Sequence, residues 1–283
     1  MKKVVLLLLV LAMTPAAFAV FVEDFEEGWA ISTEGTTPGT LSGTGAATNG
    51  WWIRDAQRVM VSQSAGNTVY ERLDSGASNA AWGPAGKLHG QNLTGVTAID
   101  LSYDVYMTPY YNSAYVWLSD GTMNGYGIKA DRQTGGRNQK ASSYKRSGST
   151  TAWTTGTVGG SESMTTLVDV ASVNTDNAPL WLTLNLRIEQ AIAGGNVTLT
   201  MWHTGGNLAD KSYANPDQVQ VVSTGIIDIT TLSWAGITFY GSLNSQPANY
   251  TMAVDDITVT AIPEPATMAL FGIGSLILVR RKK

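Results

Sequence analysis

The sequence contains no cysteine and only two histidines, and charged side chains make up only 14% of its 283 residues. Without cysteine, the chain forms no disulfide bond and offers no thiolate nucleophile or zinc ligand. The two histidines, His89 and His203, lie far apart in the sequence, and neither belongs to an H-E-x-x-H motif. These absences exclude cysteine chemistry and the helix-borne zinc hydrolases, and they leave folding to a hydrophobic core.

Other catalytic and nucleic-acid-binding signatures are absent as well. The sequence has no G-x-S-x-G nucleophile elbow and no phosphate-cradling glycine motif. The acidic run Glu23, Asp24, Glu26 and Glu27 lies on one expected strand, where a solvated or metal-binding role is favoured over paired acid catalysis. Acidic side chains number 22 against 18 basic ones, and six of the basic ones lie at the two ends. We therefore expect neither an enzyme nor a nucleic-acid-binding protein.

The N-terminal 19 residues have the three parts of a secretory signal peptide. Lys2 and Lys3 are followed by an apolar run from Val4 to Met13 and then by the A-x-A site Ala17-Phe18-Ala19. This order predicts a signal peptide over residues 1–19, with cleavage after Ala19. An uncleaved anchor helix is the alternative, against which the small residues at 17 and 19 argue.

The C-terminal 21 residues have an equally marked order. Two prolines bracket a glutamate in Pro263-Glu264-Pro265, and fourteen uncharged residues, 266–279, follow. As a helix these fourteen would span about 21 Å, against about 30 Å for a bilayer core. The chain then ends in four cations, which would hold that end on the cytoplasmic side: Arg280, Arg281, Lys282 and Lys283. A buried terminal helix is the alternative, but four terminal cations have no role in a core.

This tail resembles the PEP-CTERM protein-sorting tail of bacterial exported proteins. The resemblance covers residues 263–283 and rests on the proline-glutamate-proline triplet, the apolar segment and the basic end, in that order. It implies that the tail holds the protein transiently in the inner membrane until an exosortase-type processing protease acts near the triplet. The protein would then reside at the cell surface or in the extracellular matrix.

The central part, residues 20–262, has the composition of an all-β domain. The chain has 30 glycines, nine tryptophans and eleven tyrosines, and apolar residues alternate with polar ones. In the run Leu180 to Glu189, leucines and Ile188 alternate with polar or aromatic residues. Gly194-Gly195 then predicts a tight hairpin turn, which would pair Ile188 with Met201. The run Leu101–Met107 predicts a second hairpin with Ala114–Leu118, in which Met107 would pair with Ala114.

Further alternating segments bring the expected strands to about a dozen. They lie near 20–26, 57–63, 67–73, 125–131, 166–171, 217–223, 234–240 and 250–260. With Gly-rich turns and no helix between them, these strands predict an antiparallel two-sheet sandwich, and their pattern resembles that of jelly-roll domains. Segments 32–50 and 132–162 are rich in Gly, Ser and Thr and predict long surface loops.

Three short stretches of this domain resemble concanavalin-like and carbohydrate-binding-module jelly rolls. They are residues 24–29 (DFEEGW), residues 120–127 (DGTMNGYG) and residues 254–259 (VDDITV). The resemblance implies a structural calcium that ties the first strand to the last through Glu26 and Asp255. The alternation of the last strand points Asp255 inward, and a buried carboxylate needs a partner such as Ca²⁺. The alternative is a carboxylate at a sandwich edge that is solvated or hydrogen-bonded to backbone amides.

The polar faces of both expected hairpins carry aromatic side chains. Exposed rings next to Asp, Asn and Arg suit sugars, which stack on the rings and accept hydrogen bonds. The residues expected to bind carbohydrate are Tyr106, Tyr115, Trp117, Trp181, Arg187 and Trp202. Burial of these rings in the sandwich is the alternative. We therefore expect an exported, non-enzymatic surface or matrix protein, or alternatively a lectin-like module that binds extracellular polysaccharide.

Overall fold

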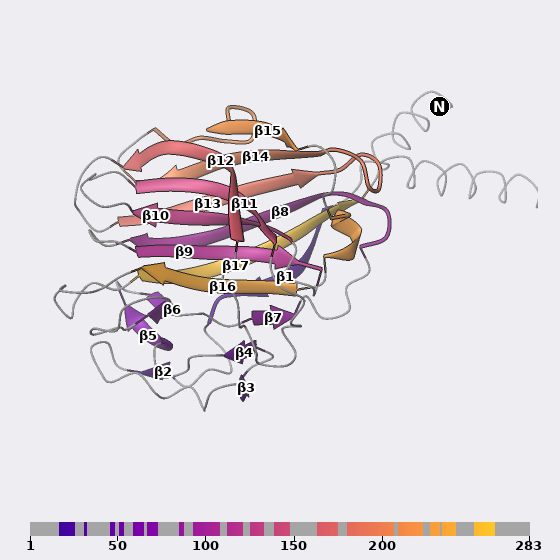
Figure 1. The fold of residues 1–283 in the computed structure, drawn as a ribbon. Coiled ribbons are helices and arrows are strands. Elements are labelled where there is room, and N and C mark those ends of the chain that lie inside the picture. The colour runs from indigo at the N-terminus through magenta and orange to yellow at the C-terminus, as the bar shows by residue number, and fades with distance from the viewer. Residues whose placement is uncertain are drawn as a thin grey trace, which may run out of the picture.

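The protein is a sandwich of two antiparallel sheets, sheet A and sheet B, in the computed structural model (Figure 1). This confirms the predicted fold class. The structure describes residues 17–25, 31–32, 46–48, 51–53, 59–64, 67–72, 85–87, 93–107, 112–120, 125–132, 139–147, 163–174, 180–206, 209–222, 227–232, 234–241 and 252–263. Most of the expected signal peptide and the tail from Glu264 onward lie outside these residues.

Sheet A holds nine of the described strands, in the order β15-β14-β13-β8-β17-β6-β5-β2, with β1 also paired to β17. All of its pairings are antiparallel except that of β2 with β5. The strands are β1 Phe18–Glu23, β2 Ile31–Ser32, β5 Val59–Ser64, β6 Asn67–Arg72, β8 Val96–Met107, β13 Leu180–Glu189, β14 Val197–Gly205, β15 Gln218–Val222 and β17 Met252–Pro263. The domain's first strand thus pairs with its last.

Sheet B holds eight of the described strands, in the order β12-β11-β10-β9-β16-β7-β4-β3. They are β3 Ala46–Thr48, β4 Trp51–Ile53, β7 Ala85–Lys87, β9 Asn112–Ser119, β10 Gly125–Arg132, β11 Gln139–Ser147, β12 Ser163–Asn174 and β16 Trp234–Gly241. The short 3₁₀ helix η2, Ile229–Thr231, precedes β16 and is capped by the Asp228 side chain. β11 lies within segment 132–162, so the expectation of one long loop there is wrong.

The core lies between the sheets and follows the alternation of the strands. In β13, Leu182, Leu184, Leu186 and Ile188 are buried, whereas the residues between them are half-buried on the other face. β8 contributes Leu101, Tyr103 and Val105 in the same way. Alternation has this effect because successive side chains of a strand point to opposite faces of its sheet. The outer face of sheet A therefore carries the polar half of each strand.

The expected hairpin between β8 and β9 is wrong. β8 pairs with β13 and β17 in sheet A, whereas β9 pairs with β10 and β16 in sheet B. The chain crosses from one sheet to the other between Met107 and Asn112. The two strands differ in the environment that they require: β8 has one polar face, whereas the residues of β9 from Ala114 to Leu118 are all buried. That difference in pattern is the signal that could have separated them.

The hairpin of β13 and β14 exists, but its predicted register is wrong by two residues. Ile188 pairs with Leu199, and Leu186 pairs with Met201. The connection is longer than a two-residue turn, because residues 190–196 separate the strands. Gly194 adopts the expected positive φ, at 71°. The register follows from the longer loop, since loop length sets hairpin pairing.

The start of β1 overlaps the expected signal-peptide cleavage site. Phe18 pairs with Ala261 and Ala19 with Thr260, and the register then shifts before Phe21 pairs with Val259. Cleavage after Ala19 would leave the part of β1 beyond this irregularity. The shortened strand would therefore keep its regular pairing with β17.

Candidate functional site

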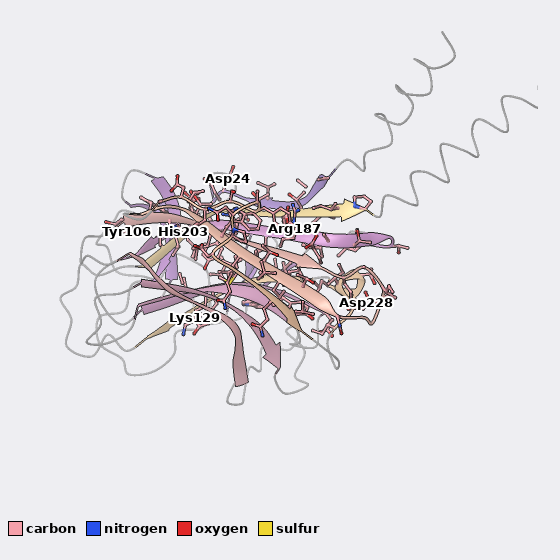
Figure 2. The ribbon with its side chains drawn as sticks, turned by 90° about the horizontal axis from the view of Figure 1, so that it is seen from above. Asp24, Tyr106, Lys129, Arg187, His203 and Asp228 are labelled. Atoms are coloured by element: carbon pink, nitrogen blue, oxygen red, sulfur yellow. The ribbon has the colours of Figure 1, made fainter. Side chains whose placement is uncertain are left out.

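Four of the six residues expected to bind carbohydrate lie on the outer face of sheet A. They are Tyr106 on β8, Trp181 and Arg187 on β13, and Trp202 on β14, and all four are half-buried. Figure 2 labels Tyr106 and Arg187 on this sheet, and Lys129 on sheet B. Tyr106 and Trp181 lie directly opposite each other across the ladder, with ring centroids 5.3 Å apart and planes tilted by 43°.

A second aromatic pair lies further along the same face. Trp202 is opposite Asn185, two same-face positions and about 13 Å along the strand from Trp181. The Tyr213 ring meets Trp202 edge to face, at 5.7 Å between centroids and 66° between planes. Tyr213 comes from the segment between β14 and β15, where Ser212 and Asn215 form an isolated bridge. It is 41% exposed, so the segment presents a ring to solvent.

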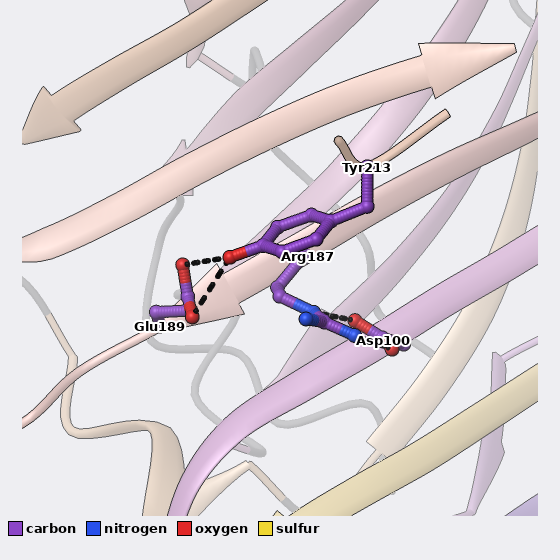
Figure 3. Close-up of polar contacts among 4 residues, drawn as sticks. All are labelled: Asp100, Arg187, Glu189 and Tyr213. Atoms are coloured by element: carbon purple, nitrogen blue, oxygen red, sulfur yellow. Dashed lines mark hydrogen bonds and ion pairs between the residues drawn. The ribbon is translucent and has the colours of Figure 1, made fainter. Parts of the chain in front are cut away.

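Arg187 connects this aromatic pair to a carboxylate (Figure 3). Its Nε and Nη2 atoms donate to the two oxygens of Asp100, each at 2.6 Å. The guanidinium lies 4.0 Å from the centroid of the Tyr213 ring, whose hydroxyl donates to the Glu189 carboxylate at 3.1 and 3.2 Å. The hydrogen bond with Asp100 raises the pKa of Arg187 above its ordinary value. The network fixes Tyr213 and compensates the charge of Arg187.

The stretch between the two aromatic pairs is acidic. Thr183 donates to Asp104 at 2.6 Å across β13 and β8. Burial raises the pKa of Asp104, that hydrogen bond lowers it, and the negative charge of Asp256 raises it further. Asp255 is opposite Asp104 and only 5% exposed, and its Oδ1 accepts from the Asp256 amide at 2.9 Å. Carboxylates therefore gather beside Tyr106 and Trp181.

The inward direction predicted for Asp255 is wrong. The register of β17 against β8 shifts between Asp255 and Thr258, and Asp256 has a positive φ of 48°. This bulge reverses the alternation, so Asp255 shares the outer face with Asp104 while Ile257 is buried. Because Asp and Asn tolerate a positive φ better than most residues, the pair Asp255-Asp256 was a signal for a bulge.

The other two expected sugar-binding rings lie elsewhere and are not accessible. Tyr115 is 3% exposed and Trp117 is fully buried, both on β9 of sheet B. Trp117 lies between Gly127 and Gly236 in the ladder, and a Cβ atom on Gly236 would overlap its indole. The expectation that these rings form an open face is therefore wrong. Glycines opposite a large ring on both neighbouring strands are the mark of close packing.

Asp100, Glu189 and Tyr213 belong to the outer-face network and were not predicted from the sequence. Asp100 is in phase with the polar residues of β8, which was a usable signal. Its pairing with Arg187 depends on the ladder between β8 and β13, and the two residues are 87 positions apart in the sequence. Tyr213 lies in a polar segment, KSYANPDQ, that gives no periodic signal.

Among the described residues, one histidine–carboxylate pair could suggest catalysis. His203 Nδ1 lies 2.6 Å from Asp217 Oδ2, with side chains 2% and 8% exposed. His203 shares the inner face of sheet A with Leu184, its partner in the ladder. The adjacent backbone bond from Lys211 to the His203 carbonyl, 2.9 Å, fixes the same segment. The pair thus holds segment 209–217 against β14 and offers no accessible base.

A calcium site is not formed by the described residues alone. Within the described ranges, no three His, Cys, Asp or Glu side chains are grouped so that they could hold a metal ion. Glu26, one of the two expected ligands, lies outside these ranges. Asp255 is buried and has carboxylate neighbours, as a cation would favour. A calcium site at Asp255 therefore stays a prediction.

The end of β17 leads directly into the tail. Residues 261–283 match the sequence model of the PEP-CTERM protein-sorting motif. The chain carries a PEP-CTERM sorting tail. The PEP-CTERM motif marks an exported protein and is a substrate signal for exosortase-type processing. In the part of the chain that the structure describes, no helix is long and apolar enough to cross a membrane. The apolar segment of the PEP-CTERM tail lies outside that part.

Comparisons of the sandwich with known proteins find only distant likenesses. No curated protein sequence matches the chain. A CBM2 module of the Lactobacillus casei BL23 phage J-1 evolved Dit is 11% identical, with a TM-score of 0.43, over 89% of this chain and 98% of that one. A β-1,3-glucanase from Mycobacterium marinum is 11% identical, with a TM-score of 0.41, over 86% and 98%.

Proposed function

We propose that this protein is an exported cell-surface or extracellular-matrix component that is processed through its PEP-CTERM tail and performs no catalysis. The observation that carries this proposal is the continuity of β17 with the sorting motif: Pro263 is the last residue of the strand and the first of the triplet. The buried state of the His203–Asp217 pair supports a non-enzymatic role.

Replacing Arg280, Arg281, Lys282 and Lys283 with glutamine tests the sorting role. Without these cations the end of the tail is no longer held on the cytoplasmic side, so membrane retention before processing should be lost. Fractionation of cells and mass spectrometry of the exported protein measure this. Lys211→Gln in the sandwich is the control and should leave the distribution unchanged. Unchanged retention of the four-residue variant would contradict the sorting role.

A second candidate function is binding of extracellular polysaccharide by the outer face of sheet A. It is supported by two aromatic pairs on one face, Tyr106 with Trp181 and Trp202 with Tyr213, separated by hydrogen-bonding side chains. Because Trp181 and Trp202 are about 13 Å apart along the strands, the face suits a ligand of several linked sugar units better than a single sugar. Asp104, Thr183 and Asn185 between the pairs would accept and donate hydrogen bonds to hydroxyl groups.

Affinity electrophoresis of the protein in gels that contain β-glucan, xylan or an amino-sugar polymer tests this binding. Trp202→Ala should weaken retention by roughly fivefold, because a stacked ring contributes about 1 kcal/mol. Val219→Ala is the matched control, since Val219 is an exposed residue, 51% accessible, on the neighbouring strand β15. Failure of the unaltered protein to be retarded in any of these gels would contradict the proposal.

A further inference from the structure

The start of the tail, after β17, and the turn between β13 and β14 lie at the same end of sheet A. Pro263, the last residue of β17, pairs with Val96 on β8, and next to it Ile262 pairs with Ala98. Ala98 pairs in turn with Glu189, the last residue of β13, and the Gln190 amide donates to the Thr97 carbonyl at 2.8 Å. The turn between β13 and β14 therefore begins two strands, about 10 Å, from the end of β17. Figure 1 shows both at the same end of the sandwich.

The turn, residues 190–196, is held rigidly. The Gly195 amide donates to the Ile192 carbonyl at 2.8 Å, and Gly194 supplies a positive φ of 71°. Gln190 is 3% exposed and braces the turn from inside: its Nε2 donates to the Gly195 carbonyl at 3.0 Å, and its Oε1 accepts from the Ile229 amide at 2.9 Å. A turn fixed in this way loses little conformational freedom when its tip contacts a partner.

The tip of this turn is apolar and uncharged. Residues 191–194 read AIAG and are all exposed. Ile192 is 75% exposed, more than any of the other large hydrophobic residues on the described surface, which range from 41% to 60%. A rigid turn that presents an isoleucine to water, in a segment 190–196 that contains no charged residue, is suited to an apolar or interfacial partner.

The position of the tail indicates which partner this is. The matched sorting motif begins at Ala261, a fully buried residue inside β17, so no spacer separates the sandwich from the tail. If the apolar segment of the tail enters a bilayer, the end of the sandwich at Pro263 must lie close to the lipid headgroups. The tip at Ile192 would then face the same surface.

We propose that the Ile192 turn is a membrane-docking element, which inserts into the headgroup region of the bilayer beside the point where the tail enters. The inference rests on the proposed anchoring of the tail. Docking by this second contact would orient the sandwich, with the 190–196 turn toward the lipid and the opposite end of sheet A away from it. It would also keep the triplet at residues 263–265 at the membrane surface, where a membrane-embedded protease acts.

The absence of cysteine allows a direct test with single-cysteine variants of the full chain. Ile192→Cys and, as the control, Ala209→Cys are each labelled with an environment-sensitive NBD fluorophore and reconstituted into phosphatidylethanolamine–phosphatidylglycerol vesicles. Ala209 is also exposed, but it follows β14 at the far end of the sheet, about 25 Å from the turn. The fluorophore at 192 should shift to the blue and resist quenching by aqueous iodide, whereas the one at 209 should remain quenched.

Each other result contradicts the proposal in a distinguishable way. If the chain is vesicle-bound but the fluorophore at 192 is quenched as strongly as the one at 209, docking is wrong and tail anchoring stands. If both fluorophores are protected equally, the contact is not specific to this end of the sandwich, and docking is also wrong. If the chain stays in the aqueous phase, both the docking and the proposed anchoring are wrong.

Discussion

Replacing Trp117 with alanine should destabilise the domain severely. The indole is fully buried on β9, where glycines on β10 and β16 lie opposite it. Removal of a buried tryptophan costs about 3–5 kcal/mol, because its apolar surface is lost from the core and the cavity collapses only partly. Domains of this size are stable by about 5–15 kcal/mol, so the loss would take a large share of the total.

Thermal unfolding followed by circular dichroism measures this effect. For a domain of about 240 residues, each kcal/mol shifts the Tm by about 2–4 °C, so the Tm should fall by about 6–20 °C. Trp202→Ala is the matched control: the same residue type is removed from the half-buried outer face, and the cost should be about 1–2 kcal/mol because less area is given up. Gly236→Ala should also destabilise, because its Cβ would overlap the Trp117 ring. A loss for Trp117→Ala no larger than that for Trp202→Ala would refute the packing argument.

Three further substitutions test the charges of the outer face. Burial raises the pKa of Asp104, so the ionised carboxylate destabilises the fold at neutral pH and this cost disappears as the pH falls and the group is protonated. Asp104→Asn should therefore have a higher Tm than the unaltered protein at pH 7. The Tm difference between the two proteins should shrink toward pH 4 when the Tm is measured against pH. Asp100→Asn should cost about 1–2 kcal/mol in urea unfolding and less in high salt, because it breaks the two-bond pair with Arg187; a salt-independent loss would contradict an ionic origin. If calcium is bound, chelation should lower the Tm, because calcium at a free concentration about 100-fold above its Kd adds about 2.7 kcal/mol of stability. Asp255→Asn should abolish most of this response, and a Tm that does not change with chelator would exclude the site.

The agreement between sequence and structure is closest where a strand has one polar face. Alternation in residues 180–189 and 101–107 identified β13, the second half of β8 and their buried sides correctly, because period-2 patterning reports which face meets the core. It failed for β11, whose sequence QKASSYKRS has no apolar alternation. It also failed for β9, which is covered on both faces, so that the phase of Trp117 carried no information on exposure.

The candidate site was predictable only in part for the same reason. Tyr106, Trp181, Arg187 and Trp202 were identified because they are large or charged residues on the polar side of their strands. Their partners Asp100 and Tyr213 depend on pairing between distant segments and on a loop path, neither of which is encoded in local pattern. The bulge at Asp256 shows the same limit, because one irregular residue reverses the direction of Asp255.

The sequence by itself determined that the chain carries an export-sorting tail, and it determined the class of fold. Sorting signals are linear, since they are recognised as extended or apolar segments at a chain end, and the strand alternation is likewise local. The tertiary structure alone decided which aromatic rings are accessible, because exposure depends on what the opposite sheet and the intervening loops cover. It also brought the Ile192 turn beside the end of β17, since β8 lies between β13 and β17, which are far apart in the chain.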